Sequence, residues 1–184
     1  MVATEKLTWE DYQQFPDDGN RYEIIDGEVY VSPSPGDAHQ FVATDLTTLL
    51  NVHVRERKLG RLVAAPFDVM LGPHDVFQPD ILFIRAERRT VVIRDGRMYD
   101  APDLCVEIAS PSTRQTDRTR KFDRYAHFGV AEYWLVEPIE QTVETFVLEG
   151  GAYVSLGTAV GNEQIVSPVM PDLALTAAEV FEDL

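Results

Sequence analysis

Two acidic residues in this chain lie in or beside runs of apolar residues, where a carboxylate is costly to bury. Asp80 directly precedes the run 81–84, and Glu107 lies inside the run 104–109. A carboxylate on an apolar strand is retained when it is paired or binds a metal. Lys121 follows in a stretch with helical character. Two buried acids and a lysine are the groups needed to hold a divalent metal and activate a water against a phosphodiester.

The choice of Asp80 depends on its context, because the dipeptide Pro-Asp occurs four times. Most copies are expected in turns, since both residues favour turns. Only Asp80 and Asp103 run straight into long apolar strands. Asp103 and Glu107 lie on one strand about 13 Å apart at ~3.3 Å per residue, too far to share a metal. Asp80 is on a different strand, and pairing of the two strands can bring it beside Glu107.

The lysine that such a site needs is not on the strand of Glu107. Glu107 and Ala109 share a face of that strand, and Ala109 takes the position of lysine in the acid-x-lysine pattern of metal nucleases. Lys121 is the substitute, because Asp117, Lys121 and Tyr125 fall on one face of a helix. That face is predicted to point at the strand end carrying Glu107. The alternative is that Lys121 only pairs with Asp117 on the helix surface.

Two further residues are accessory candidates. Glu23, in the first hairpin strand, could supply another carboxylate, or it supports a turn at the surface. His39, in the first turn of a long helix, could contact phosphate or shuttle protons, or be structural. The remaining histidines and Cys105 show no metal-ligand spacing, so no zinc site is expected. For Asp80 and Glu107 the alternative is a structural role, such as pairing with arginine.

The composition is that of an ordinary globular protein. The chain has 184 residues, 45% apolar and 26% charged, and we expect residues 1–184 to form a single domain. No apolar stretch approaches the ~20 residues of a membrane helix. Residues 1–10 lack the pattern of a signal peptide. With a single cysteine, these features indicate a cytoplasmic protein.

The charge distribution leaves two interpretations of the surface. The net charge of −15 argues against a protein that coats nucleic acid nonspecifically. The windows 55–61, 85–97 and 114–124 nevertheless hold 14 of the 16 Lys and Arg residues, and none follows Arg124. One side of the molecule could therefore be locally positive. The alternative is that these windows are solvated helix and turn faces.

Periodicity predicts helices interleaved with strands. Helices are expected over 7–14, 37–58, 116–128 and 176–184. A hairpin is expected from Arg21–Ile25 and Glu28–Val31 on an Asp-Gly turn. Other strands are expected over 61–65, 66–71, 78–84, 104–109, 131–136, 141–148 and 152–156, with 90–99 a small hairpin or an irregular excursion. This order predicts an α/β fold with a mixed central sheet flanked by helices, an N-terminal hairpin and a C-terminal β extension.

A set of motifs in this order resembles the Uma family of restriction-endonuclease-like proteins, within the PD-(D/E)xK nuclease superfamily. The resemblance runs from about residue 7 to residue 153, and its motifs are Arg21–Glu28, Gln78–Asp80, Val106–Thr113, Asp117, Lys121, Tyr125 and Gly129–Trp134. It implies a restriction-endonuclease-like core, a Mg²⁺-dependent phosphodiesterase site and a bacterial cytoplasmic context. By this match Asp80 is the motif aspartate, Glu107 the second acid and Lys121 a lysine moved from strand to helix.

The resulting hypothesis is a DNA endonuclease. Asp80, Glu107 and the backbone carbonyl of Ile108 would hold one Mg²⁺, or Mn²⁺, because oxygen ligands suit these ions. Lys121 would orient the attacking water or stabilise the developing negative charge. Glu23, His39 and Tyr125 are accessory candidates. A homodimer is expected, since a small nuclease that cuts both strands needs two sites and residues 133–184 offer β surface.

Two other functions remain open from the sequence. The chain could be a catalytically silent nuclease fold that serves as an interaction or nucleic-acid-binding module, which the overall acidity and Ala109 favour. It could also be a metal-dependent hydrolase of a smaller phosphate ester. Divalent-metal binding through Asp80 and Glu107 discriminates the silent module from the endonuclease. Comparing cleavage of a duplex with that of a nucleotide ester separates the two enzymes.

Overall fold

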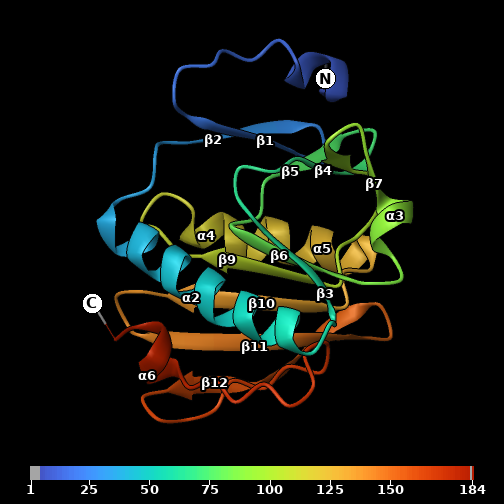
Figure 1. The fold of residues 1–184 in the computed structure, drawn as a ribbon. Helices are drawn as coiled ribbons and strands as arrows, with labels where there is room; N and C mark the ends of the chain where they lie inside the picture. Colours follow the sequence, from blue (N-terminus) through green and yellow to red (C-terminus); the bar gives the residue numbers. More distant parts are fainter. Residues whose placement is uncertain (1–4, 183) are drawn as a thin grey trace.

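The computed structural model describes residues 5–182 and 184, and its strands form two sheets (Figure 1). In spatial order, the first sheet is β2 (Glu28–Ser32), β1 (Arg21–Ile25), β5 (Asp75–Phe77), β4 (Val69–Gly72), β8 (Arg97–Met98) and β7 (Ile93–Arg94). The second is β12 (Ala152–Val160), β11 (Thr142–Glu149), β10 (Glu132–Glu137), β9 (Leu104–Ile108), β6 (Ile81–Arg85) and β3 (Gly60–Ala64).

The helical segments are short apart from one. They are α1 (Trp9–Tyr12), α2 (Asp37–Glu56), α3 (Arg89–Val92), α4 (Arg114–Thr116), the π-helical turn η1 (Asp117–Lys121), α5 (Phe122–Phe128) and α6 (Ala177–Val180). Among the described residues, none of these is both long and apolar enough to cross a membrane. Two predictions fall in part outside the described residues. They are the lack of a signal-peptide pattern in residues 1–10 and the end of the helix expected over 176–184.

The second sheet is mixed, which confirms the expected fold class. β9 and β10 are parallel, whereas β6 is antiparallel to β9 and β11 is antiparallel to β10. The parallel pair is joined by α4, η1 and α5, as a parallel connection requires a crossover. This crossover places η1, with its charged residues, between β9, the strand that carries Glu107, and β10.

The N-terminal hairpin forms on the expected turn. Asp26 has φ 52° and Gly27 has φ 82°, and two successive positive φ values are what a two-residue turn of this kind needs. β1 pairs antiparallel with β2 from Arg21 opposite Ser32 to Ile25 opposite Glu28. The hairpin belongs to the first sheet, where β1 also pairs with β5.

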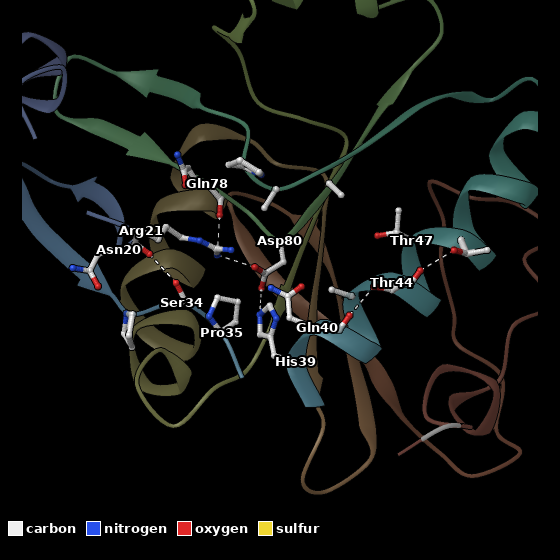
Figure 2. Close-up of a pocket in the computed structure, with 17 residues that line it drawn as sticks. Asn20, Arg21, Ser34, Pro35, His39, Gln40, Thr44, Thr47, Gln78 and Asp80 are labelled. Carbon is white, nitrogen blue, oxygen red and sulfur yellow. Dashed lines mark hydrogen bonds and ion pairs between the residues drawn. The ribbon is translucent and has the colours of Figure 1, made fainter. Parts of the chain in front are cut away.

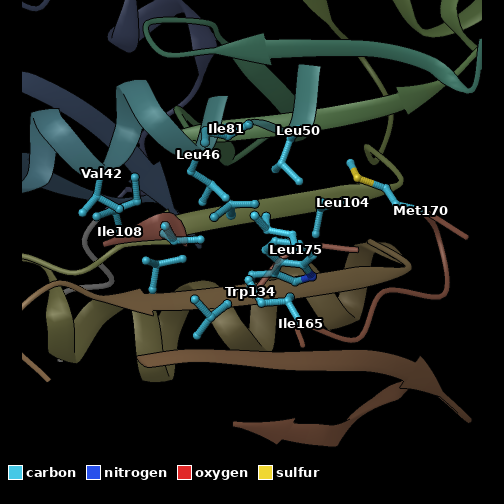
Figure 3. Packing of buried hydrophobic residues seen from close by; sticks show 14 of the residues in the cluster. Val42, Leu46, Leu50, Ile81, Leu104, Ile108, Trp134, Ile165, Met170 and Leu175 are labelled. Atoms are coloured by element: carbon cyan, nitrogen blue, oxygen red, sulfur yellow. The ribbon is translucent and has the colours of Figure 1, made fainter. Parts of the chain in front are cut away.

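One face of the second sheet is covered by α2 (Figures 1 and 3). The buried apolar residues of α2 recur every four residues, so they form one stripe. The stripe packs on alternate residues of β6, β9 and β10, and the C-terminal segment completes this core with Ile165, Met170 and Leu175. The helix ends before Gly60, where a Cβ atom would lie 2.0 Å from the carbonyl oxygen of Ile84, so only glycine allows the approach of β3 to β6.

The opposite face of the same strands packs against α5. Leu82, Cys105 and Tyr133 form a second core with Tyr125 of α5. Because successive strand residues point to opposite faces, Glu107 lies on the α5 side with Cys105, while Ile108 packs on the α2 side. The two faces of β9 thus point to different cores, with Glu107 on the α5 side and Ile108 on the α2 side.

The strand expected over 78–84 begins later, at Ile81. Residues 75–77, between the strands expected over 66–71 and 78–84, form β5 of the first sheet, and the chain then crosses to β6 of the second. Pro79 lies at the crossing, where its missing N–H would break a ladder. The small hairpin expected within 90–99 is present as β7 and β8, although its first part forms the helical turn α3. The helix expected over 116–128 contains a π turn at η1.

Candidate active site

Asp80 lies at the start of β6, beside the end of β9. The two strands pair with Ile81 opposite Val106, so the next position along this antiparallel register sets Asp80 across from Glu107. Both residues line one cavity of about 300 Å³. The structure therefore brings together the two acids that the sequence singled out.

The carboxylate of Asp80 is held from three directions. Arg21 Nη1 donates to Oδ1 at 2.7 Å, and the backbone N–H of Ile108 donates to Oδ2 at 2.8 Å. His39 Nε2 lies 3.1 Å from the same Oδ2 (Figure 2). Burial opposes ionisation, but the hydrogen bond from His39 and the charge of Arg21 outweigh it and lower the pKa of Asp80 to about 2. Asp80 is thus a carboxylate at neutral pH.

Glu107 is held from the α5 side. Tyr125 donates its hydroxyl to Oε1 at 2.8 Å, and Lys121 Nζ lies 3.1 Å from Oε2. Lys121 also lies 2.8 Å from Glu23 Oε2 and 3.5 Å from Asp117 Oδ1. Burial raises the pKa of Glu107 well above its usual value, and Lys121 opposes this rise. Burial alone would lower the pKa of Lys121, but its carboxylate neighbours raise it well above the ordinary value, which keeps it charged.

Glu23 connects the two halves of the site. Its Oε2 binds Lys121, and its Oε1 accepts a hydrogen bond from the backbone N–H of Gln78 at 2.8 Å. Gln78 precedes Pro79 and Asp80, so Glu23 ties the segment that positions Asp80 to the lysine that contacts Glu107. Arg21 and Glu23 lie two residues apart on β1 and reach the site from the same face.

The buried carboxyl groups of the site outnumber its cations. Asp80, Glu107, Glu23 and Asp117 are all buried acids, while the neighbouring cations are Arg21 and Lys121. The Asp117 carboxylate accepts no hydrogen bond from the described residues, and burial raises its pKa to about 6. Four buried carboxyl groups beside two cations offer more oxygen ligands than these cations occupy, which suits a divalent cation bound by hard oxygen ligands.

A known family and a solved structure are similar to this chain. Residues 9–178 match a family, Uma2, described as "Putative restriction endonuclease". The chain belongs to the Uma2 family. The crystal structure of a putative nuclease of DUF820 from Anabaena variabilis is similar to this fold with a TM-score of 0.76 at 24% identity, covering 96% of this chain and 98% of that one. A search of curated proteins found no match. The family and the fold together support a nuclease.

In this Uma2-family chain the lysine approaches the second acid from a helix. Ala109, on the face of Glu107, carries no charge, and the ammonium group near Glu107 comes from Lys121 at the end of η1. π-Helical turns are rare in proteins, and those that occur are often found at functional sites. Lys121 is 1% exposed and lines a small cavity of about 40 Å³ with Glu23 and Asp117, whereas the 300 Å³ cavity is lined by Asp80 and Glu107.

Sequence reasoning missed Arg21 as a site residue, although it lies only two residues before Glu23. Two charged residues at alternate positions of an otherwise apolar strand were the available signal. It also missed the hydroxyl groups of the 110–113 loop, which line the 300 Å³ cavity opposite Arg21 and His39. No group of three or more His, Cys, Asp or Glu side chains among the described residues is arranged as a metal-binding cluster.

The locally positive surface expected from the basic windows is largely neutralised in the structure. Arg114 and Arg118 pair with the buried Glu137 at 3.1 and 3.2 Å. Arg124 pairs with the buried Asp75. These arginines are held by acids of the same chain, so they do not form a continuous row of free cations beside the site.

Proposed function

We propose that this Uma2-family chain is a metal-dependent endodeoxyribonuclease that hydrolyses DNA phosphodiester bonds with water. The observation that carries the proposal is that Asp80 and Glu107, from neighbouring antiparallel strands, line one cavity. The excess of buried carboxylates over cations supports a bound dication. We also propose that the protein acts in the cytoplasm and as a homodimer, as expected from the sequence.

The proposed metal ligands are the carboxylates of Asp80 and Glu107 and the backbone carbonyl oxygen of Ile108. A bound Mg²⁺ or Mn²⁺ lowers the pKa of a water and stabilises charge on phosphate oxygens. Asp80 suits this role because its low pKa keeps it ionised. Two carboxylates with retained waters are a ligand set that Mg²⁺ favours.

The other residues hold these ligands and the substrate. Lys121 and Tyr125 fix the two oxygens of Glu107, and the charge of Lys121 favours the ionised form of Glu107. In the transition state the same charge would stabilise negative charge developing nearby. His39 lines the cavity beside Asp80, where it could contact a phosphate oxygen or move a proton.

A second candidate is a catalytically silent module that binds nucleic acid or another partner. One observation favours it: the oxygens of Asp80 and Glu107 already have partners within the protein, namely Arg21, His39, Lys121 and Tyr125. Acids satisfied in this way can serve a structural role without a metal. Such a module has no reason to bind Mg²⁺ or Mn²⁺ through these two residues.

The test is cleavage of supercoiled plasmid with Mg²⁺ or Mn²⁺. Wild type is compared with Asp80→Asn, which keeps the shape of the side chain, and with Asp123→Asn, an exposed carboxylate of α5. Nicking by wild type and Asp123→Asn, and its loss in Asp80→Asn, is the expected result.

Equal nicking by all three proteins would indicate a contaminating nuclease and would overturn the assignment of Asp80. If none of them cuts, metal titration separates the two candidates. Binding of Mg²⁺ or Mn²⁺ that depends on Asp80 retains the nuclease, whereas no binding favours the silent module.

A further inference from the structure

A second, larger cavity adjoins the one between Asp80 and Glu107. Its volume is about 610 Å³, within the ~300–1,000 Å³ typical of ligand sites. The two cavities share Arg21, His39 and Asp80 among their lining residues. In Figure 2, Asp80 and His39 lie near the middle, and side chains of α2 extend away from them to one side. A chain bound at Asp80 would therefore continue into this cavity.

The part of the cavity beyond His39 is here called the α2 groove. It consists of the α2 residues Gln40, Thr44, Thr47 and Thr48 and the segment 64–66 across from them. All of these residues are uncharged. Gln40, Thr44 and Thr48 are solvent-exposed, so their amide and hydroxyl groups are accessible to a ligand.

The chemistry of the α2 groove does not suit a phosphate backbone. Tracking of phosphates relies on Lys and Arg. Among the described residues that line the cavity, Arg21 is the one lysine or arginine, and it is already paired with Asp80 at 2.7 Å. Amide and hydroxyl side chains are instead the groups that read base edges, where Gln pairs with adenine and Thr bonds to any base. The two alanines and the proline of 64–66 offer apolar surface for a base to pack against.

The hydroxyls of α2 have hydrogen-bonding capacity left. Thr44 and Thr48 each donate to a carbonyl of the preceding turn, at 2.8 Å in both cases, and each oxygen can still accept. Thr47 Oγ1 is buried and has no hydrogen-bond partner among the described residues. A buried polar atom without a partner is uncommon and calls for one.

We propose that the α2 groove binds nucleobases of the DNA strand next to the cleaved phosphate, and that Gln40 is a specificity-determining residue that hydrogen-bonds a base edge. This inference rests on the proposed nuclease function, and it adds which part of the DNA the protein recognises. Thr44, one turn further along α2, extends the same contact.

The experiment is digestion, with Mg²⁺ or Mn²⁺, of a duplex library with randomised sequence, followed by sequencing of the cut ends. Wild type is compared with Gln40→Ala, Thr44→Ala and a matched control, Gln13→Ala, an exposed glutamine just after α1. Wild type is expected to prefer particular bases at positions beside the cut. Gln40→Ala is expected to lower the ratio of preferred to non-preferred cleavage by about tenfold, the scale of one bidentate base contact.

Every other outcome of the digestion would overturn this inference. The same base preference in wild type and Gln40→Ala, or cleavage by wild type without any preference, would overturn this inference and leave the nuclease standing. A uniform loss of cleavage at all sequences in Gln40→Ala would also overturn it, since that residue would then position the strand without reading it. Absence of cleavage of this randomised library by wild type would overturn this inference, and together with absence of Asp80-dependent binding of Mg²⁺ or Mn²⁺ it would refute the proposed function as well.

Discussion

The ammonium group of Lys121 lies 3.1 Å from the carboxylate of Glu107, and both side chains are almost completely buried. The lysine comes from a π-helical turn and the acid from the central strand β9. In this chain the contact puts a cation beside Glu107, whereas Ala109, on the same face of the strand, carries no charge.

Removing the charge of Lys121 should destabilise the fold strongly. Lys121→Met leaves Glu23, Glu107 and Asp117 without their shared cation. Breaking a buried ion pair costs about 3–5 kcal/mol, so we expect a loss of this order in urea denaturation. Lys6→Met is the matched control, because the Lys6–Asp26 pair is exposed and exposed pairs contribute little. Equal stability of wild type and Lys121→Met would show that the acids are protonated and need no cation.

The pH dependence of stability should contain a contribution from Asp117. Burial raises the pKa of Asp117 to about 6 from an ordinary 3.8. With a raised folded-state pKa, the stabilising contribution is present below pH 4 and is lost as the pH rises through 6. At 1.36 kcal/mol per unit, the loss is about 3 kcal/mol.

The corresponding measurement compares the free energy of unfolding of wild type and Asp117→Asn at pH 4 and pH 8. Asparagine does not ionise, so the variant should gain about 3 kcal/mol relative to wild type between the two pH values. A difference between the proteins that stays constant with pH would contradict the assignment.

Metal addition should stabilise the protein through Glu107. A cation at 100 times its dissociation constant adds about 2.7 kcal/mol to the stability of the folded state. We expect Mg²⁺ or Mn²⁺ to raise the melting temperature of wild type and of Glu149→Gln, an exposed glutamate at the end of β11. Glu107→Gln should show no such rise. An equal rise in Glu107→Gln would place the metal elsewhere.

The hydroxyl of Tyr125 should tune the affinity for metal. It donates to Glu107 Oε1 at 2.8 Å, and loss of such an outer contact typically lowers metal affinity by about 10–100-fold. We expect this drop in Tyr125→Phe, measured by titration with Mn²⁺. Tyr133→Phe is the control, because the buried hydroxyl of Tyr133 donates instead to the backbone carbonyl of Asp117 at 3.1 Å. A similar drop in both variants would indicate general loosening of the core.

The sequence by itself determined the elements and the candidate acids. The apolar run after Asp80 predicted the strand that follows this acid, and the apolar run around Glu107 predicted the strand that contains it. Both predictions were possible because the apolar side chains that mark a buried strand are neighbours in the sequence. The four-residue spacing of Asp117, Lys121 and Tyr125 predicted a helix face directed at Glu107. These features depend on neighbours a few residues apart, so a single sequence reveals them.

The tertiary structure alone decided the partners of these acids. Arg21 and His39 reach Asp80 across 59 and 41 residues, and Glu23 reaches Lys121 from the first sheet. Such contacts depend on which strands pair and where the chain crosses between sheets at Pro79. Periodicity holds no information about either, because hydrophobic burial is non-directional and the register is fixed only when all strands pack together.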